Sequence, residues 1–586
     1  MKLHFLVSTI MYQWYGGGSN GTGVLGMHHT NDVPYLLPIP LLDLPNNHNN
    51  NICSNHSVLE VQHQTTATWN STDRISLSVS VPTPINNDTN NNTISELQSS
   101  INKIWTSGRH TWFGMYCRIY IHLTLFYWTI SFFFNFFVLF YSFLFWYIEN
   151  HRKEIFVCGC NTYGQCGIST TASNTANSST LSDSDNTTNT NLIIVPQFSS
   201  MISKISVQFI SCGWDHTAIL TTYGQVYTFG CSLDGRLGLS DIMDTQTTKL
   251  SVPTLVHFSI DDHNQTSDHT NTTIIQSIAC GEKHSLAVDT NGNVYGWGTN
   301  RHGLLPTSNS TVTNTSSSIL TRNNNYSPIP VYLDMVTTVS KTHNYTENDS
   351  IDKVYAGWQH SIAVTKAGYI ITWGNNRYYQ CGRESIVPSS SSTTTSKSST
   401  QNILLPGIVY DTSNHTPLIC QQLATGWYHT IIINSLYQVY TWGRSDLGQL
   451  GIGIETNTDR SKSSLPCSIS LSCYFVDKDK QHDTSSIISP PISISNIACG
   501  SESTYISLSC GCIYSCGWNE HSNLSIDTKS TTIITENIFI PTLMYIPNYS
   551  LAQLHEYYQR HPLEERPKFV CAGATTFLRL PIFNMK

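Results

Sequence analysis

The stretch IACGEKHSLAVDTNGNVYGWGTNRHGLL, from Ile278 to Leu305, contains the unit that decides the fold of this 586-residue chain. Gly281 and, three residues later, His284 open a run of alternating apolar residues, and an Asn-Gly pair follows. A second run then ends in Trp297 and a glycine. Alternating residues on both sides of an Asn-Gly turn predict a β-hairpin.

The same hairpin recurs along the chain in a fixed register. Four copies place a closing aromatic residue thirteen positions after the histidine: Gly213, His216 and Phe229; Gly281, His284 and Trp297; Gly357, His360 and Trp373; and Gly426, His429 and Trp442. A fifth copy has Ser503 in the histidine position and Cys516 in the aromatic position, again thirteen apart. Low-complexity sequence does not keep such a register, so we predict a repeat architecture.

A sheet built on one such hairpin cannot bury both of its faces, so the copies must stack, and a ring leaves only short exposed edges. Closing residues stand at seven places: Trp14, Cys158, Phe229, Trp297, Trp373, Trp442 and Cys516. We therefore predict an all-β, seven-bladed β-propeller over residues 11–580. The closing strand at Tyr12–Trp14 lacks an opening strand, and Ala572-Gly573 opens a hairpin near the other end. The two ends are expected to complete one blade together.

These repeats resemble those of the regulator of chromosome condensation family, whose members fold as seven-bladed propellers. Three stretches are similar to its secretion-regulating guanine nucleotide exchange factor branch: TWGRSDLGQLG (Thr441–Gly451), YSCGWNEH (Tyr514–His521) and CGWDHT (Cys212–Thr217). The resemblance implies a protein-binding propeller that regulates a small GTPase in connection with secretion. The alternative is a non-catalytic scaffold for exocyst-type partners.

Three tryptophans are the candidate partner-binding residues: Trp214, Trp358 and Trp427, each directly after a repeat glycine and therefore near a strand end. Similar tryptophans in the plant ultraviolet-B receptor of this family lie on one flat face and mediate contacts. That receptor carries arginine where this chain has Asp215, Gln359 and Tyr428, which argues against light sensing here. Exposed tryptophans often anchor interfaces. The alternative is that these side chains fill gaps between blades.

The repeat histidines are interpreted as structural, because the same position on the core-facing side of every hairpin has a packing and hydrogen-bonding role rather than an individual chemical one. The chain contains no Gly-x-x-x-x-Gly-Lys-Ser/Thr motif for phosphates. No spacing among the 17 cysteines supplies four converging zinc ligands, and reduced structural thiols are expected. We expect no enzyme activity, no cofactor and no metal.

Polar tracts rich in Asn, Ser and Thr interrupt the repeats at residues 46–100, 169–194, 306–350, 385–402 and 452–487. Such tracts cannot bury enough apolar surface to order themselves and are predicted to be loops. The net charge of −8 and the lack of a Lys/Arg run argue against nucleic-acid binding. The apolar run in the first ten residues is too short for a convincing signal peptide. We expect a monomer in the cytoplasm, with the nucleus as an additional location.

An uncharged, phenylalanine-rich segment at residues 123–148 is long enough for a transmembrane helix. It would, however, split a hairpin between the opening at Gly108–His110 and the closing at Cys158. Removing residues 114–148 restores the spacing of thirteen between His110 and Cys158. Gly-Met-Tyr at 114–116 can also be encoded with a splice-donor sequence, and a phenylalanine-rich run can be the translation of a pyrimidine tract. We therefore predict that residues 114–148 are a translated intron, with a single-pass membrane protein as the alternative.

Overall fold

The computed structural model describes residues 12–19, 33–38, 100–116, 153–168, 192–258, 273–306, 326–335, 349–384, 402–453, 463–471, 494–546 and 549–581, apart from short gaps at 108, 241–247, 334, 470, 527–536, 550 and 561–566. These residues form seven four-stranded antiparallel sheets. The all-β class predicted from the hairpin repeats is confirmed.

Six sheets are each built from four consecutive strands. Sheet 1 contains β3 (Ser100–Thr106), β4 (His110–Tyr116), β5 (Lys153–Cys160) and β6 (Leu192–Phe198). Sheet 2 contains β7 (Val207–Cys212), β8 (His216–Thr221), β9 (Val226–Cys231) and β10 (Lys249–Leu255). Sheet 3 contains β11 (Ile275–Cys280), β12 (His284–Asp289), β13 (Val294–Thr299) and β14 (Tyr326–Leu333).

The same pattern continues toward the C-terminus. Sheet 4 contains β15 (Ile351–Ala356), β16 (His360–Thr365), β17 (Ile370–Gly374) and β18 (Ile403–Ile408). Sheet 5 contains β19 (Cys420–Thr425), β20 (His429–Asn434), β21 (Val439–Arg444) and β22 (Ser463–Ile469). Sheet 6 contains β23 (Ile494–Cys499), β24 (Ser503–Leu508), β25 (Ile513–Gly517) and β26 (Ile538–Leu543).

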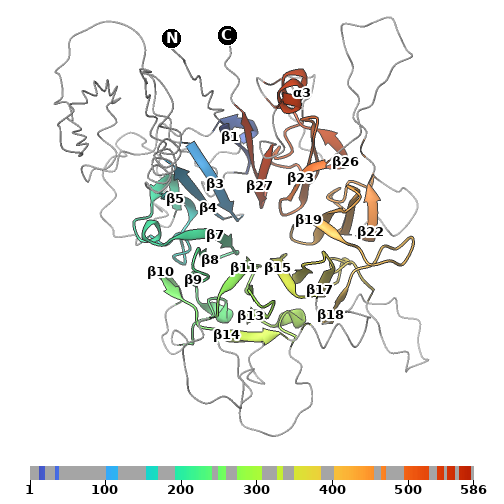
Figure 1. Cartoon of the computed structure of the whole chain (residues 1–586). Helices are drawn as coiled ribbons and strands as arrows, with labels where there is room; N and C mark the ends of the chain where they lie inside the picture. The colour runs from blue at the N-terminus through green and yellow to red at the C-terminus, as the bar shows by residue number, and fades with distance from the viewer. Residues whose placement is uncertain are drawn as a thin grey trace, which may run out of the picture.

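The first strands of the sheets contact one another around a centre in the order β3, β7, β11, β15, β19, β23 and β27 (Lys568–Ala572), and β27 contacts β3 again. Figure 1 shows the sheets arranged around this centre, with β1 (Tyr12–Gly18) and β27 in the same sheet. Short 3-10 turns connect some strands, at η2 (Ile202–Lys204), η3 (Leu233–Gly235) and η5 (Arg301–Gly303). Helix α3 (Leu551–Arg560) packs over the β24–β25 turn at Gly511. The arrangement is that of a propeller.

The seventh sheet, the closing sheet, joins the two ends of the chain. It contains β2 (Val33–Pro38), β1 (Tyr12–Gly18), β28 (Thr575–Pro581) and β27, in that order. Strand β1 pairs with β28 in a continuous antiparallel register from Tyr12 opposite Pro581 to Gly18 opposite Thr575. The prediction that the two ends complete one sheet is therefore confirmed. Neither end leaves its strand edge unpaired, and unpaired edges invite association.

The outermost strands carry proline where a further strand would otherwise pair. Proline lacks the N–H that a ladder needs and is confined to edge strands and irregularities. One proline from each outer strand illustrates this: Pro34, Pro196, Pro253, Pro330, Pro406, Pro466 and Pro541. The register of these strands with their neighbours is interrupted in every sheet. The ring thus ends at its rim in edges that resist further pairing.

Strands β4 and β5 pair without interruption, from His110 opposite Gly159 to Tyr116 opposite Lys153. The predicted intron boundary at Gly114 therefore falls inside β4, and the rest of the phenylalanine-rich segment lies outside the described residues. Within the described part of the chain, no helix has the length and apolar character of a membrane span.

We propose that residues 114–148 are absent from a spliced form of the chain, because the shortened hairpin matches the other sheets. Joining Phe113 to Glu149 puts Asn150 five positions after His110, where Asn434 stands after His429 in β20. The Asn434 Oδ1 accepts the backbone N–H groups of residues 436 and 438 at 2.9 Å each, and so caps the hairpin turn. The junction therefore supplies both the spacing and the capping residue.

A chain lacking residues 114–148 should fold with a melting temperature equal to or above that of the full chain. The additional change Asn150→Ala in the shortened chain should cost about 1 kcal/mol, because the turn loses its cap. Thermal unfolding followed by circular dichroism measures both variants, and transcript sequencing shows whether spliced messages lack these codons. An insoluble shortened chain, or spliced messages that all keep the codons, would refute the proposal.

Candidate functional site

The Gly-x-x-His motif brings a histidine ring directly over a glycine. A Cβ added to Gly281 would lie 2.2 Å from Cε1 of His284, closer than any side chain can approach. The same close contact occurs at Gly213, Gly357 and Gly426. Each ring is fully buried. Glycine is therefore required at this position because the imidazole occupies the space of a side chain.

These four rings and that of His110 in sheet 1 each reach a hydroxyl group of the next sheet. The Nε2 atoms lie 2.7–3.2 Å from their partners: His110 from Thr217, His216 from Ser285, His284 from Ser361, His360 from Thr425 and His429 from Thr504. We call these five histidines and their hydroxyl partners the histidine belt. In four of the five bonds, the hydroxyl belongs to the residue directly after the histidine position of the next sheet. The exception is Thr425, at the end of β19.

The hydroxyl groups determine which nitrogen carries the proton. The Ser285 hydroxyl donates to the carbonyl oxygen of Arg236 at 3.1 Å, and the Thr217 hydroxyl donates to that of Gln165 at 2.8 Å. A hydroxyl has one proton to give, so it accepts the hydrogen bond from the histidine. The imidazole of His216 is then neutral with its proton on Nε2, and its buried Nδ1 has no hydrogen-bond partner.

Burial keeps the whole belt uncharged. It lowers the pKa of His284 and of His429 to about 4, and that of His360 to about 3. The pKa of His110 is lowered to about 3 by burial and by the nearby charge of Arg109. Each histidine already has its position fixed by the seam that it bridges. The geometry supports the structural interpretation of the repeat histidines.

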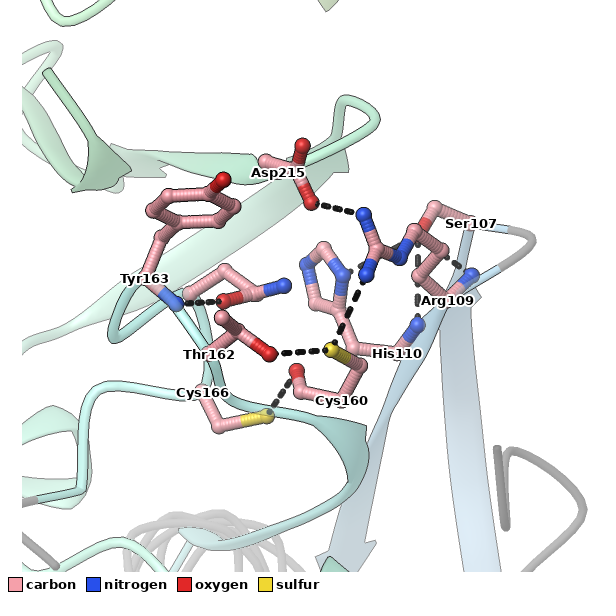
Figure 2. Close-up of polar contacts among 9 residues, drawn as sticks. Ser107, Arg109, His110, Cys160, Thr162, Tyr163, Cys166 and Asp215 are labelled. Carbon is pink, nitrogen blue, oxygen red and sulfur yellow. Dashed lines mark hydrogen bonds and ion pairs between the residues drawn. The ribbon is translucent and has the colours of Figure 1, made fainter. Parts of the chain in front are cut away.

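Two sheets depart from the Gly-x-x-His motif, and a neighbouring residue makes a substitute hydrogen bond in each. In sheet 6, where Ser503 replaces the histidine, the Tyr505 hydroxyl accepts a 2.6 Å bond from Thr576 of the closing sheet. In sheet 1 the opening glycine was predicted at 108, but Ser107 occupies the equivalent place, and its Oγ lies 3.0 Å from Nδ1 of His110. The motif assignment at Gly108–His110 is corrected accordingly. Ser107 gives His110 a partner for its second nitrogen, as Figure 2 shows.

The closing tryptophans complete the seams. Trp297, Trp373 and Trp442 are fully buried. Their Nε1 groups donate to loop carbonyl oxygens of the preceding sheet, at residues 236, 304 and 380, over 2.9–3.2 Å. Their place in the repeat is therefore explained by packing between sheets.

The three candidate partner-binding tryptophans meet one another. The ring centroids of Trp214 and Trp358 lie 4.8 Å apart, those of Trp214 and Trp427 5.7 Å, and those of Trp358 and Trp427 4.4 Å. They come from sheets 2, 4 and 5, which are not all adjacent in the ring. Side chains from sheets 2 and 5 can touch only over the centre, so we call this cluster the tryptophan triad. All three side chains are partly exposed. The triad does not fill a gap between two sheets.

Backbone hydrogen bonds fix the turns that carry two members of the triad. The N–H of Glu282 donates to the carbonyl oxygen of Trp358 at 3.1 Å, and the N–H of Trp358 to that of Trp427 at 3.1 Å. The N–H of Trp427 donates to Ser501 at 2.9 Å, and the N–H of Ser501 to Gly573 at 2.8 Å. The turns of sheets 3 to 6 and of the closing sheet at this end of the ring therefore form one connected layer.

Polar pairs surround the triad at three seams. Arg109 forms an ion pair with Asp215, the Gln359 Nε2 donates to Glu282 at 2.9 Å, and Arg444 Nη1 donates to Glu502 at 3.0 Å. Burial raises the pKa of Glu502 to about 7, against the opposing effect of the Arg444 charge. The side chain of Tyr428 packs edge-on against Tyr378, with the ring centroids 5.5 Å apart.

Cys280 and Cys381 are buried cysteines that form no disulfide bond. Burial raises the pKa of Cys280 to about 11 and of Cys381 to about 12, so these thiols are protonated at neutral pH. Among the described residues, no three His, Cys, Asp or Glu side chains gather in a way that could hold a metal ion.

Comparison with known proteins defines the family. Residues 147–554 match the RCC1-like domain, and the chain therefore belongs to that family. The bovine secretion-regulating guanine nucleotide exchange factor is 26% identical over 389 residues, which cover 65% of this chain and 66% of that protein. This chain thus matches just under two thirds of that relative's length.

Two further similarities concern the ring itself. The Arabidopsis thaliana ultraviolet-B receptor is 25% identical over 260 residues, covering 44% of this chain and 46% of the receptor. The crystal structure of Saccharomyces cerevisiae Prp20p superposes with a TM-score of 0.53 at 14% identity, covering 100% of this chain and 94% of that one. At that identity the structural match shows the fold alone.

Acid should destabilise the ring through the histidine belt. The folded-state pKa values near 3 to 4 lie below the unfolded value of about 6.5, so the unfolded chain binds more protons below pH 6.5. Stability from the belt is present above pH 6.5 and is lost as the pH falls toward 4. Each buried histidine should contribute a slope of about 1.4 kcal/mol per pH unit.

His284→Gln should make the free energy of unfolding less dependent on pH between 4.5 and 6, by about one proton, because glutamine does not titrate. His257→Gln, at an exposed position, is the matched control. Urea unfolding at a series of pH values measures the slopes. Equal slopes for the wild-type chain and the His284→Gln variant would show that the belt histidines are not held neutral by the fold.

Proposed function

We propose that this protein regulates a small GTPase and that the tryptophan triad is the centre of its binding face. The observation that carries the proposal is the triad itself: three large aromatic side chains meet at the centre of the ring while remaining partly exposed. Rigid aromatic anchors of this kind dominate protein–protein interfaces. We further infer that the seven sheets act as seven blades of one closed ring, which holds the face rigid.

The names of the relatives support a small GTPase as the class of partner. The bovine relative is named for guanine nucleotide exchange in secretion, and the yeast Prp20p structure was studied for binding to Gsp1p and histones. The net charge of −8 disfavours nucleic acid as a partner, because the phosphate backbone is also negative. None of the relatives described above is named for an exocyst component, so we propose the GTPase alone.

Nucleotide exchange on this face would depend on a difference in affinity for the nucleotide-free and the loaded GTPase. A protein that binds the nucleotide-free GTPase more tightly than the loaded one lowers the affinity for nucleotide by the same factor, through linkage. No proton transfer or covalent step is needed. The belt histidines are committed to the seams, and Glu502 and Asp215 are paired with arginines. The polar groups around the triad therefore hold the face in shape.

Replacing Trp214, Trp358 and Trp427 together by alanine should weaken GTPase binding by at least about thirtyfold, because an anchoring tryptophan can carry ~2 kcal/mol or more of binding. The probe is the GTPase recovered with the full-length protein in an affinity pull-down, prepared in nucleotide-free and loaded forms. Tyr223→Ala is the matched control, because Tyr223 is a strongly exposed aromatic residue at the opposite end of sheet 2. The control should bind normally.

The form of the GTPase distinguishes the two modes of action. An exchange factor should lose affinity chiefly for the nucleotide-free form, whereas a scaffold should lose it equally for both forms. Melting temperatures show whether the triple variant remains folded. If the variant's folded fraction binds both forms as the parent does, the triad is not the interface and the proposal fails.

A further inference from the structure

The side chain of Arg109, at the seam between sheets 1 and 2, contacts one member of the tryptophan triad. Arg109, the residue before β4, forms an ion pair with Asp215 and places its guanidinium 5.2 Å from the ring centre of Trp214. Its Nη2 donates to the Cys160 thiol at 3.3 Å. Figure 2 shows the arginine extending from β4 toward Asp215, with Cys160 beneath it. Sheet 1 thus contacts the tryptophan triad although it contributes no tryptophan.

Both ends of this contact are anchored. The backbone N–H of Arg109 donates to the Ser107 hydroxyl at 3.2 Å, and its carbonyl oxygen accepts the N–H of Cys160 at 2.7 Å. The carbonyl oxygen of Asp215 accepts the N–H of Cys231 at 2.8 Å. The belt bond from His110 to Thr217, at 2.7 Å, joins the same two sheets one residue after Arg109 and two after Asp215. The guanidinium is therefore presented to Trp214 from a fixed backbone.

The ring of Trp214 is the one that Arg109 approaches, whereas the turns of Trp358 and Trp427 are joined to adjacent sheets by backbone hydrogen bonds. The side chains of Arg109 and Asp215 are only 24% and 12% exposed, so solvent screens their interaction little. A planar guanidinium can pair with a carboxylate and stack on an indole at once, which an ammonium group does poorly.

We propose that Arg109 is a positioning residue: it holds Trp214 in the orientation in which the ring meets Trp358 and Trp427. The inference rests on the proposed function of the triad as a GTPase-binding face. Its consequence is that sheet 1 controls the shape of the face through one ion pair and one cation–π contact. Without the guanidinium, Asp215 is left to the more distant cations Arg236 and Lys283, with Glu282 opposing them. Trp214 then loses the group that fixes its ring.

The test uses the full chain labelled with 5-fluorotryptophan, in which the resonance of Trp214 is assigned by the Trp214→Phe variant. Arg109→Gln should shift and broaden that resonance and weaken binding of the nucleotide-free GTPase about 5- to 10-fold in the folded fraction, while loss of the ion pair lowers the melting temperature. Arg109→Lys, which keeps the charge but not the planar group, should give the same effects in smaller size. Arg444→Gln is the matched control: it breaks a comparable ion pair, to Glu502, at a seam where the arginine lies over Tyr378 instead. It should leave the Trp214 resonance in place.

A residue that acts through Trp214 has no target once that ring is removed. In a Trp214→Ala background, Arg109→Gln should therefore cause no further loss of affinity. Independent losses that multiply, or a Trp214 resonance unchanged by both Arg109 variants, would overturn the inference. If Trp214→Ala alone leaves GTPase affinity unchanged, it is the proposed function that fails. Should Arg109→Gln not fold, the smaller change Arg109→Lys carries the same comparison.

Discussion

The hydrogen bond from a buried histidine to a hydroxyl group of the next sheet is the constraint on which the ring depends. This hydrogen bond explains why the repeat contains a glycine, a histidine, a hydroxyl residue and a tryptophan, because all four meet at the seam between two sheets. The imidazole of His216 needs the glycine beneath it, and its Nε2 reaches Ser285 at 2.9 Å. The Ser285 hydroxyl donates a hydrogen bond to the carbonyl oxygen of Arg236, and the same oxygen accepts the indole N–H of Trp297 at 3.0 Å. Histidine, hydroxyl and tryptophan are thus kept in register by hydrogen bonds among buried polar groups, and glycine is kept because the imidazole fills the space of a side chain.

The sequence alone was sufficient for the features that have a period. The spacing of thirteen predicted the hairpins, and the unmatched strand at Tyr12 predicted closure by the two ends, which the pairing of β1 with β28 confirms. It also placed the triad residues correctly near strand ends. Repeat positions reveal themselves by recurrence, and recurrence survives even the long polar inserts.

What the sequence did not predict are contacts without a period. Tyr505 substitutes for a missing histidine from two residues away, so a search for histidine at the expected place finds only Ser503. The meeting of three tryptophans across the centre depends on how many sheets close the ring and how each turn is oriented. The approach of Arg109 to Trp214 joins residues more than a hundred positions apart. A Thr or Ser after each histidine is the one signal of the belt in the sequence, and it does not stand out because hydroxyl residues are common throughout this chain.

Three kinds of contact link the histidine belt to the tryptophan triad. Histidine bonds fix neighbouring sheets against each other, backbone bonds fix the turns above them, and ion pairs such as that of Arg109 with Asp215 fix the side chains that remain exposed. A face assembled in this way is preorganised, so little ordering cost is due when a partner binds.

The most direct test of this account is a double-mutant cycle on His216 and Ser285, with unfolding free energies measured in urea at pH 7.5. The single changes His216→Ala and Ser285→Ala and the double change should reveal a coupling energy of about 1 kcal/mol, because the two groups share one buried hydrogen bond. A cycle on His216 and Thr504, which belong to different seams, should be additive within about 0.5 kcal/mol. A coupling between His216 and Ser285 no larger than that of the distant pair would contradict the claim that this bond holds the ring together.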